Sequence, residues 1–74
     1  MKKLSLDKIN DKIISVNDSV EIDWRDSNEV DICNVDENVK MQIEKNFKGH
    51  VESNYYDKDE KILTLYFKYD VDQD

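Results

Sequence analysis

Residues 20–33 read VEIDWRDSNEVDIC, and this stretch decides the fold. Apolar and charged side chains alternate on both sides of the polar residues 25–28. A period of two is typical of a β-strand with one buried face, so we expect two antiparallel strands joined by a turn. The alternation that points Val20, Ile22 and Trp24 inward points the intervening carboxylates outward.

The next segment predicts the main helix, over residues 36–48. Asp36 is a good N-cap, and Gly49 is a typical residue just beyond a helix end. Lysines in the last turn suit the negative end of the helix dipole. The apolar side chains recur every four residues, at Val39, Ile43 and Phe47.

The C-terminal part predicts a second hairpin. Residues 50–56 and 61–71 flank the polar turn 57–60, and both runs are rich in β-branched and aromatic side chains. In the last run, Leu63 and Leu65 share one face with Phe67, Tyr69 and Val71. We therefore expect this hairpin to belong to the same sheet.

The N-terminal segment is ambiguous between helix and strand. Ser5 is a plausible N-cap, and the apolar residues Leu6, Ile9 and Ile13 have helical spacing. Ile14 and Val16 instead alternate like a strand. We expect a short helix over residues 5–11 and a strand near residues 12–16.

Together these segments predict an α+β fold: a small antiparallel sheet of four to five strands with one main helix packed on one face. The 74 residues form a single acidic domain, 1–74, because domains usually need about 100 residues each. A chain this short buries only about 60% of its unfolded surface.

The negative charge is concentrated in the middle of the chain. The formal net charge is −7, from 18 acidic and 11 basic residues. Residues 18–37 hold eight carboxylates and only one basic side chain, Arg25, for a local charge of −7. Nucleic acid and anionic membranes repel such a surface, so we expect a basic protein surface as the partner.

The sequence also predicts a cytoplasmic location. No apolar run approaches the roughly 18 residues of a membrane span. Residues 1–7 read MKKLSLD, without the apolar stretch of a signal peptide. The single cysteine, Cys33, cannot form an internal disulfide and fits a reducing compartment.

The sequence contains few residues that suit catalysis or metal binding. His50 is the only histidine, and the acidic surroundings of Cys33 disfavour a reactive thiolate. Residues 57–61 begin like a calcium loop but lack its central glycine and its final glutamate. One histidine and one cysteine are too few for a zinc site. We expect no enzyme activity, no metal and no cofactor.

The outward carboxylates of residues 20–33 are the one feature that indicates a mechanism of binding. Carboxylates two residues apart on a strand lie about 6.6 Å apart, and neighbouring strands lie about 4.8 Å apart. This charge density is comparable to that of nucleic acid, with one phosphate about every 3.4 Å per strand. The predicted partner-binding residues are Glu21, Asp23, Trp24, Asp26, Glu29, Asp31, Asp36 and Glu37.

In size, acidity and Asn/Lys/Ile-rich composition, the chain is similar in kind to small acidic proteins that phages encode against host nucleases. DNA mimics and anti-CRISPR proteins belong to this kind; the resemblance covers no aligned residues. It implies a non-enzymatic inhibitor, acting in the host cytoplasm, that blocks a basic nucleic-acid-binding surface by charge mimicry.

Three other interpretations remain. The acidic surface could serve solubility alone. The chain could be a homo-oligomeric structural or adaptor protein that pairs through an edge strand or the tyrosine-rich last hairpin. It could also be an immunity protein or antitoxin that neutralises one cognate toxin.

Overall fold

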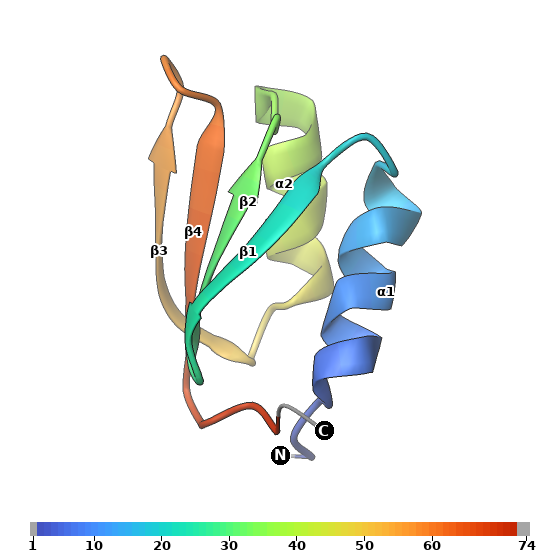
Figure 1. The fold of residues 1–74 in the computed structure, drawn as a ribbon, viewed down its shortest axis with the longest axis vertical. Helices are drawn as coiled ribbons and strands as arrows, with labels where there is room; N and C mark the ends of the chain where they lie inside the picture. The colour runs from blue at the N-terminus through green and yellow to red at the C-terminus, as the bar shows by residue number, and fades with distance from the viewer. Residues whose placement is uncertain (1, 73–74) are drawn as a thin grey trace.

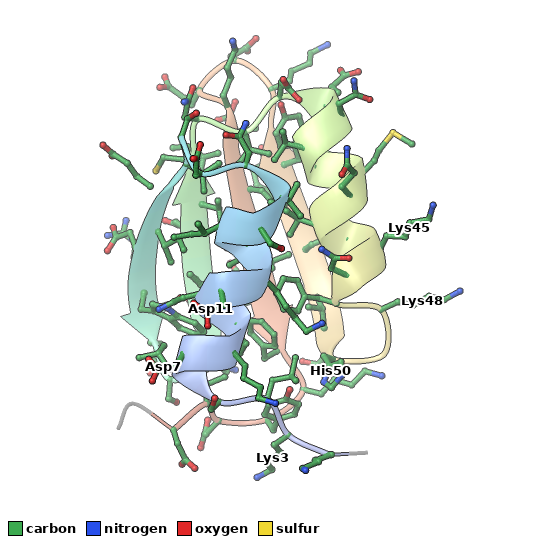
Figure 2. All side chains as sticks on the ribbon, turned by 90° about the vertical axis from the view of Figure 1, so that its right-hand side faces the viewer. Lys3, Asp7, Asp11, Lys45, Lys48 and His50 are labelled. Carbon is green, nitrogen blue, oxygen red and sulfur yellow. The ribbon has the colours of Figure 1, made fainter. Side chains whose placement is uncertain are left out.

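A computed structural model describes residues 2–72. It confirms the predicted α+β class, with four strands and two helices. The elements in chain order are α1 (Leu6–Val16), β1 (Glu21–Asp26), β2 (Glu29–Cys33), α2 (Glu37–Asn46), β3 (Val51–Asp57) and β4 (Ile62–Phe67). The strands form one antiparallel sheet in the order β1-β2-β4-β3, and both helices cover the same face of it (Figures 1 and 2).

The N-terminal helix is longer than predicted, and the strand expected near residues 12–16 is wrong. α1 continues to Val16 because Val16 extends the apolar stripe that contains the buried Ile9 and Ile13. Ile14 misled the prediction, since it points away from this stripe and is 46% exposed. Ser5 caps the helix as predicted, and its hydroxyl accepts a hydrogen bond from the Lys8 N–H.

The main helix begins where it was predicted and ends two residues earlier. The Asp36 carboxylate accepts a hydrogen bond from the Val39 N–H at 2.9 Å, as expected of an N-cap. The helix ends at Asn46, because Phe47 leaves the helical conformation while its ring remains buried against Phe67. Gly49 has a φ of +90°, a conformation that favours glycine over other residues.

Both predicted hairpins are confirmed, and the structure shows how they join. β2 and β4 are the two central strands, so the first hairpin pairs with the second through them. Val30 lies opposite Leu65, and Ile32 lies opposite Leu63. All four side chains are fully buried beneath the helices. β1 and β3 are therefore the edge strands of the sheet.

The core is apolar throughout and lies between the sheet and the helices. Its fully buried side chains come from both layers and from the loop before α2; among the largest are Ile9, Ile13, Ile32, Val35, Ile43, Phe47, Leu63 and Phe67. No polar or charged residue within 2–72 is classed as buried. Burial of this apolar surface is the main stabilising term, which leaves the charged side chains for the surface.

Candidate functional site

The candidate site is the face of the sheet that the helices leave uncovered, called the outer face below. Directly opposite residues on paired strands share a face, so the strand registers define its members up to the irregular pairing near the β1–β2 turn, where Arg25 is placed by its ion pairs with Asp23 and Asp31. Acidic and basic side chains gather on β1 and β2, whereas β4 and β3 contribute mainly neutral ones. The members are Glu21, Asp23, Arg25, Glu29, Asp31, Cys33, Ser53, Tyr55, Asp57, Ile62, Thr64 and Tyr66.

Four of the predicted binding residues, Glu21, Asp23, Glu29 and Asp31, lie together on this face. Asp23 and Asp31 face each other directly across β1 and β2. Like charges in this position destabilise a sheet. The predicted row of carboxylates therefore exists, and its centre contains a repulsive pair.

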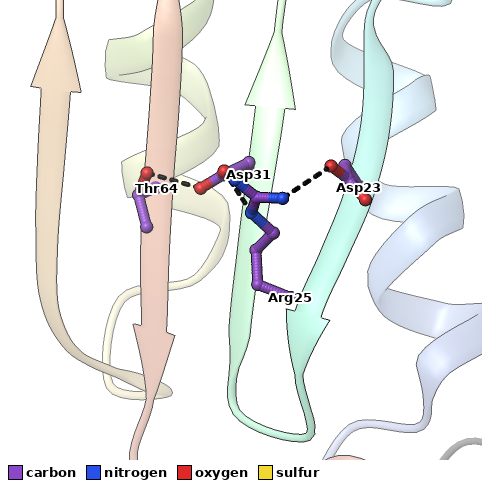
Figure 3. A network of polar contacts seen from close by, with 4 residues as sticks. All are labelled: Asp23, Arg25, Asp31 and Thr64. Atoms are coloured by element: carbon purple, nitrogen blue, oxygen red, sulfur yellow. Dashed lines mark hydrogen bonds and ion pairs between the residues drawn. The ribbon is translucent and has the colours of Figure 1, made fainter.

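Arg25 lies on the same strand and face as Asp23 and neutralises the centre of the row (Figure 3). Its Nε lies 3.0 Å from a carboxylate oxygen of Asp31, and its Nη1 lies 3.6 Å from one of Asp23. The other oxygen of Asp31 accepts a hydrogen bond from the Thr64 hydroxyl at 2.6 Å. The Asp31 side chain is only 17% exposed, so it has little surface left for a partner.

The remaining carboxylates of the outer face are more accessible. Glu21 and Asp23 are exposed on the edge strand, and Glu29 is half-buried beside Tyr66. Four carboxylates and one guanidinium leave these two strands with a net charge of −3 on the outer face. The field is negative but weaker than the sequence alone predicts.

Three further predicted residues, Asp26, Asp36 and Glu37, have local structural roles. Asp26 lies at the irregular pairing before the β1–β2 turn, and its carboxylate accepts a hydrogen bond from the Ser27 N–H. Asp36 is the N-cap of α2, and Glu37 occupies the first turn of that helix. Carboxylates at a helix N-terminus are stabilising there, so their position has a structural explanation without a partner.

Trp24 does not share a surface with the carboxylates. Its ring stacks on Phe67 at a centroid distance of 5.9 Å, and its Nε1–H donates to the Asn10 side chain of α1. The side chain thus lies on the helix-covered face of the sheet. The structure separates Trp24 from the carboxylates it was grouped with, as the alternation within β1 requires.

The neutral half of the outer face was not included in the predicted site. Tyr55 is 64% exposed on edge strand β3, opposite Thr64. Tyr66 belongs to β4 and lies opposite Glu29 of β2. Tyrosines are frequent in protein-binding surfaces because they combine apolar area with a polar hydroxyl. The alternation in β4 placed Tyr66 away from the core, but only the strand order places it beside the acidic strands.

Cys33 is half-buried at the end of β2, on the outer face. It is therefore not part of the buried core. Burial raises the pKa of its thiol, and the carboxylates of Glu21, Asp31 and Asp23 raise it further. The predicted unreactive character of this cysteine agrees with that direction.

Neither helix within residues 2–72 has the length and apolar content needed to span a bilayer. In the same part of the chain, no three side chains of His, Cys, Asp or Glu come together as ligands for a metal ion. Comparisons with known protein families, curated proteins and solved structures find no match.

Proposed function

We propose that this protein is a non-enzymatic inhibitor that binds a basic, nucleic-acid-binding protein surface through its outer face. The supporting observation is that β1 and β2 gather Glu21, Asp23 and Glu29 on a face that no other part of residues 2–72 covers. An arrangement of carboxylates on one rigid sheet resembles a short polyanion. The partner is a nuclease or nucleoprotein of the kind that phage inhibitors, including anti-CRISPR proteins, block in the host cytoplasm.

Tyr55 and Tyr66 give this surface a means of binding beyond charge. Buried tyrosines often dominate the energy of protein interfaces, whereas exposed charges mainly accelerate association and set specificity. We expect the carboxylates to attract the basic partner and the tyrosines to pack against it. Affinity should then fall as salt screens the charges, without disappearing completely.

The test is a competition experiment with purified RNA-guided and restriction nucleases. We expect the protein to prevent at least one of them from binding and cutting DNA, with weaker inhibition at high salt. Reversing Glu21, Asp23 and Glu29 to lysine should abolish inhibition. Asp31 is left unchanged because Arg25 and Thr64 already bind it.

The matched control reverses three exposed carboxylates elsewhere: Asp11 on α1, Asp18 in the following turn and Asp59 in the β3–β4 turn. Both triple variants change the net charge equally. Inhibition that is retained in the control variant and lost in the outer-face variant supports the proposal. Equal losses in the two variants would reduce the effect to overall charge and refute a specific surface.

A homo-oligomer is the second candidate, and the position of β3 favours it. β3 is an edge strand that pairs only with β4 within residues 2–72, and exposed edge strands readily pair with a second chain. Light scattering at several salt concentrations separates the two functions. A tight dimer that is insensitive to salt would favour oligomerisation over binding of a basic partner.

A further inference from the structure

An open pocket of about 450 Å³ lies at the end of the molecule where α1 begins and the chain leaves α2. Its volume is within the range of small-molecule sites. Figure 2 shows Lys3 and His50 at this end, from segments far apart in the sequence. The lining residues are Lys2, Lys3, Leu4, Ser5, Lys8 and His50.

The charge of this pocket is opposite to that of the protein as a whole. Three lysines and one histidine line it, and no acidic residue within 2–72 does, although the net charge of the chain is −7. The nearby Asp7 points to the other side of α1 (Figure 2). Asp70 is held elsewhere, because its carboxylate accepts a hydrogen bond from the Ser27 hydroxyl.

Tyr69 holds the two sides of the pocket together. Its hydroxyl accepts a hydrogen bond from the Leu4 N–H at 3.0 Å and lies 2.8 Å from Nδ1 of His50. The Lys3 ammonium lies over the same ring, 5.8 Å from its centroid. The segment before α1 is thus attached to the end of the sheet, so part of the site is formed before any ligand arrives.

The start of α1 adds to the positive character. The first N–H groups of a helix lack intrahelical acceptors and carry a partial positive charge. The N-cap Ser5 lines the pocket, so this end of α1 lies beside it. Leu4 and the lysine stems supply apolar contact beside the charges.

We propose that this pocket binds the phosphate group of a small phosphorylated molecule. Lys2, Lys3 and Lys8 would pair with the phosphate oxygens, and the apolar wall would contact the rest of the ligand. A long polyanion would also meet the acidic remainder of the protein. A small ligand avoids this repulsion, because exposed charges beyond about 8 Å are screened at physiological salt. The pocket shares no residue with the outer face, so this inference is independent of the proposed inhibitor function.

The experiment is a titration of the isotope-labelled full chain with inorganic pyrophosphate, followed by amide chemical shifts. We expect saturable shifts at Leu4, Ser5, Lys8 and His50, with a dissociation constant near or below about 1 mM. Replacing Lys2, Lys3 and Lys8 with glutamine should weaken binding about tenfold or more. These lysines are exposed, so the amide spectrum should remain that of the folded protein.

The control variant replaces Lys45, Lys48 and Lys58 with glutamine, which removes the same charge outside the pocket. It should bind pyrophosphate as the unaltered chain does. Absence of saturable shifts, or equal weakening in both variants, would overturn the proposal. A comparison of adenosine with ATP tests whether the phosphate or the base is recognised. Both contain the same base, and only ATP, which carries phosphate, should bind. Tighter binding of a short DNA duplex than of pyrophosphate, at the same residues, would assign the site to nucleic acid and refute a small-molecule ligand.

Discussion

Replacing Arg25 with glutamine tests the charge arrangement of the outer face. The change removes the guanidinium that lies 3.0 Å from Asp31 and leaves Asp23 and Asp31 facing each other. The Arg25 side chain is 58% exposed, so solvent screens its ion pair with Asp31. Loss of this pair should lower the free energy of unfolding by about 0.5–1 kcal/mol. The unmasked repulsion between the carboxylates adds about 0.5 kcal/mol.

We therefore expect Arg25→Gln to lower the free energy of unfolding by about 1–1.5 kcal/mol. In a domain of this size, each kcal/mol lowers the melting temperature by about 4–8 °C. Urea unfolding followed by the fluorescence of Trp24, which stacks on Phe67, gives the measurement. High salt should reduce the difference between the variant and the parent protein.

A double-mutant cycle with Asp31→Asn isolates the pair. Asparagine can still accept the Thr64 hydrogen bond, so the cycle removes charge and leaves that contact in place. We expect a coupling energy of about 0.5–1 kcal/mol. The helical pair of Lys40 and Glu44, at 3.3 Å, is the control, and Lys40→Gln should cost only about 0.3–0.5 kcal/mol. A coupling energy of zero would refute the role given to Arg25.

Three further predictions concern the helix layer, a turn and the thiol. Ile13→Ala should lower the free energy of unfolding by about 2–5 kcal/mol, whereas Ile14→Ala should cost less than about 1 kcal/mol, both measured in urea. Lys61 has a φ of 58°, so Lys61→Gly should stabilise the protein by up to about 1 kcal/mol in the same assay. Folding raises the pKa of the Cys33 thiol. The stability that comes from keeping this thiol protonated is therefore fully present at neutral pH, and it is lost as the pH rises through the unfolded-state and then the folded-state pKa. Alkylation of the native protein should accordingly reach its midpoint at a higher pH than alkylation in urea.

Each of these has a contrary result. Similar losses for the two isoleucines would contradict the burial of one face of α1. A destabilising Lys61→Gly would mean that the lysine side chain contributes more than its backbone conformation costs. A lower alkylation midpoint in the native protein would indicate that a nearby positive charge, such as Arg25, outweighs burial and the carboxylates.

The parts of the fold that follow from local alternation could be predicted. Residues 20–33 specify their hairpin because apolar and charged side chains alternate along both strands. The extent of α1 could not be predicted as well, since Ile14 belongs to neither the buried stripe nor a strand. Its exposure depends on where α2 and the sheet leave space, and this is tertiary information.

The candidate site was predictable in composition and only partly in arrangement. The alternation places Glu21, Asp23, Glu29 and Asp31 on one face, as the structure confirms. Arg25 was counted as a single positive charge, although its place two residues after Asp23 already put both on one face. The contact between Asp31 and Thr64 depends on the pairing of β2 with β4, which no local pattern encodes. The lysine pocket likewise needs the tertiary contact that joins Leu4 to Tyr69.

The central position of β2 has a consequence during synthesis. Its partner β4 follows far along the chain, with Thr64 emerging 33 residues after Asp31. At about 5–20 residues per second, the ribosome leaves one edge of β2 without its partner for about two to seven seconds. Throughout that interval the unpaired apolar strand that contains Val30 and Ile32 is able to pair with another nascent chain. Acidic side chains between and beside them repel a second copy of the same strand, so the carboxylates also guard against aggregation before folding is complete.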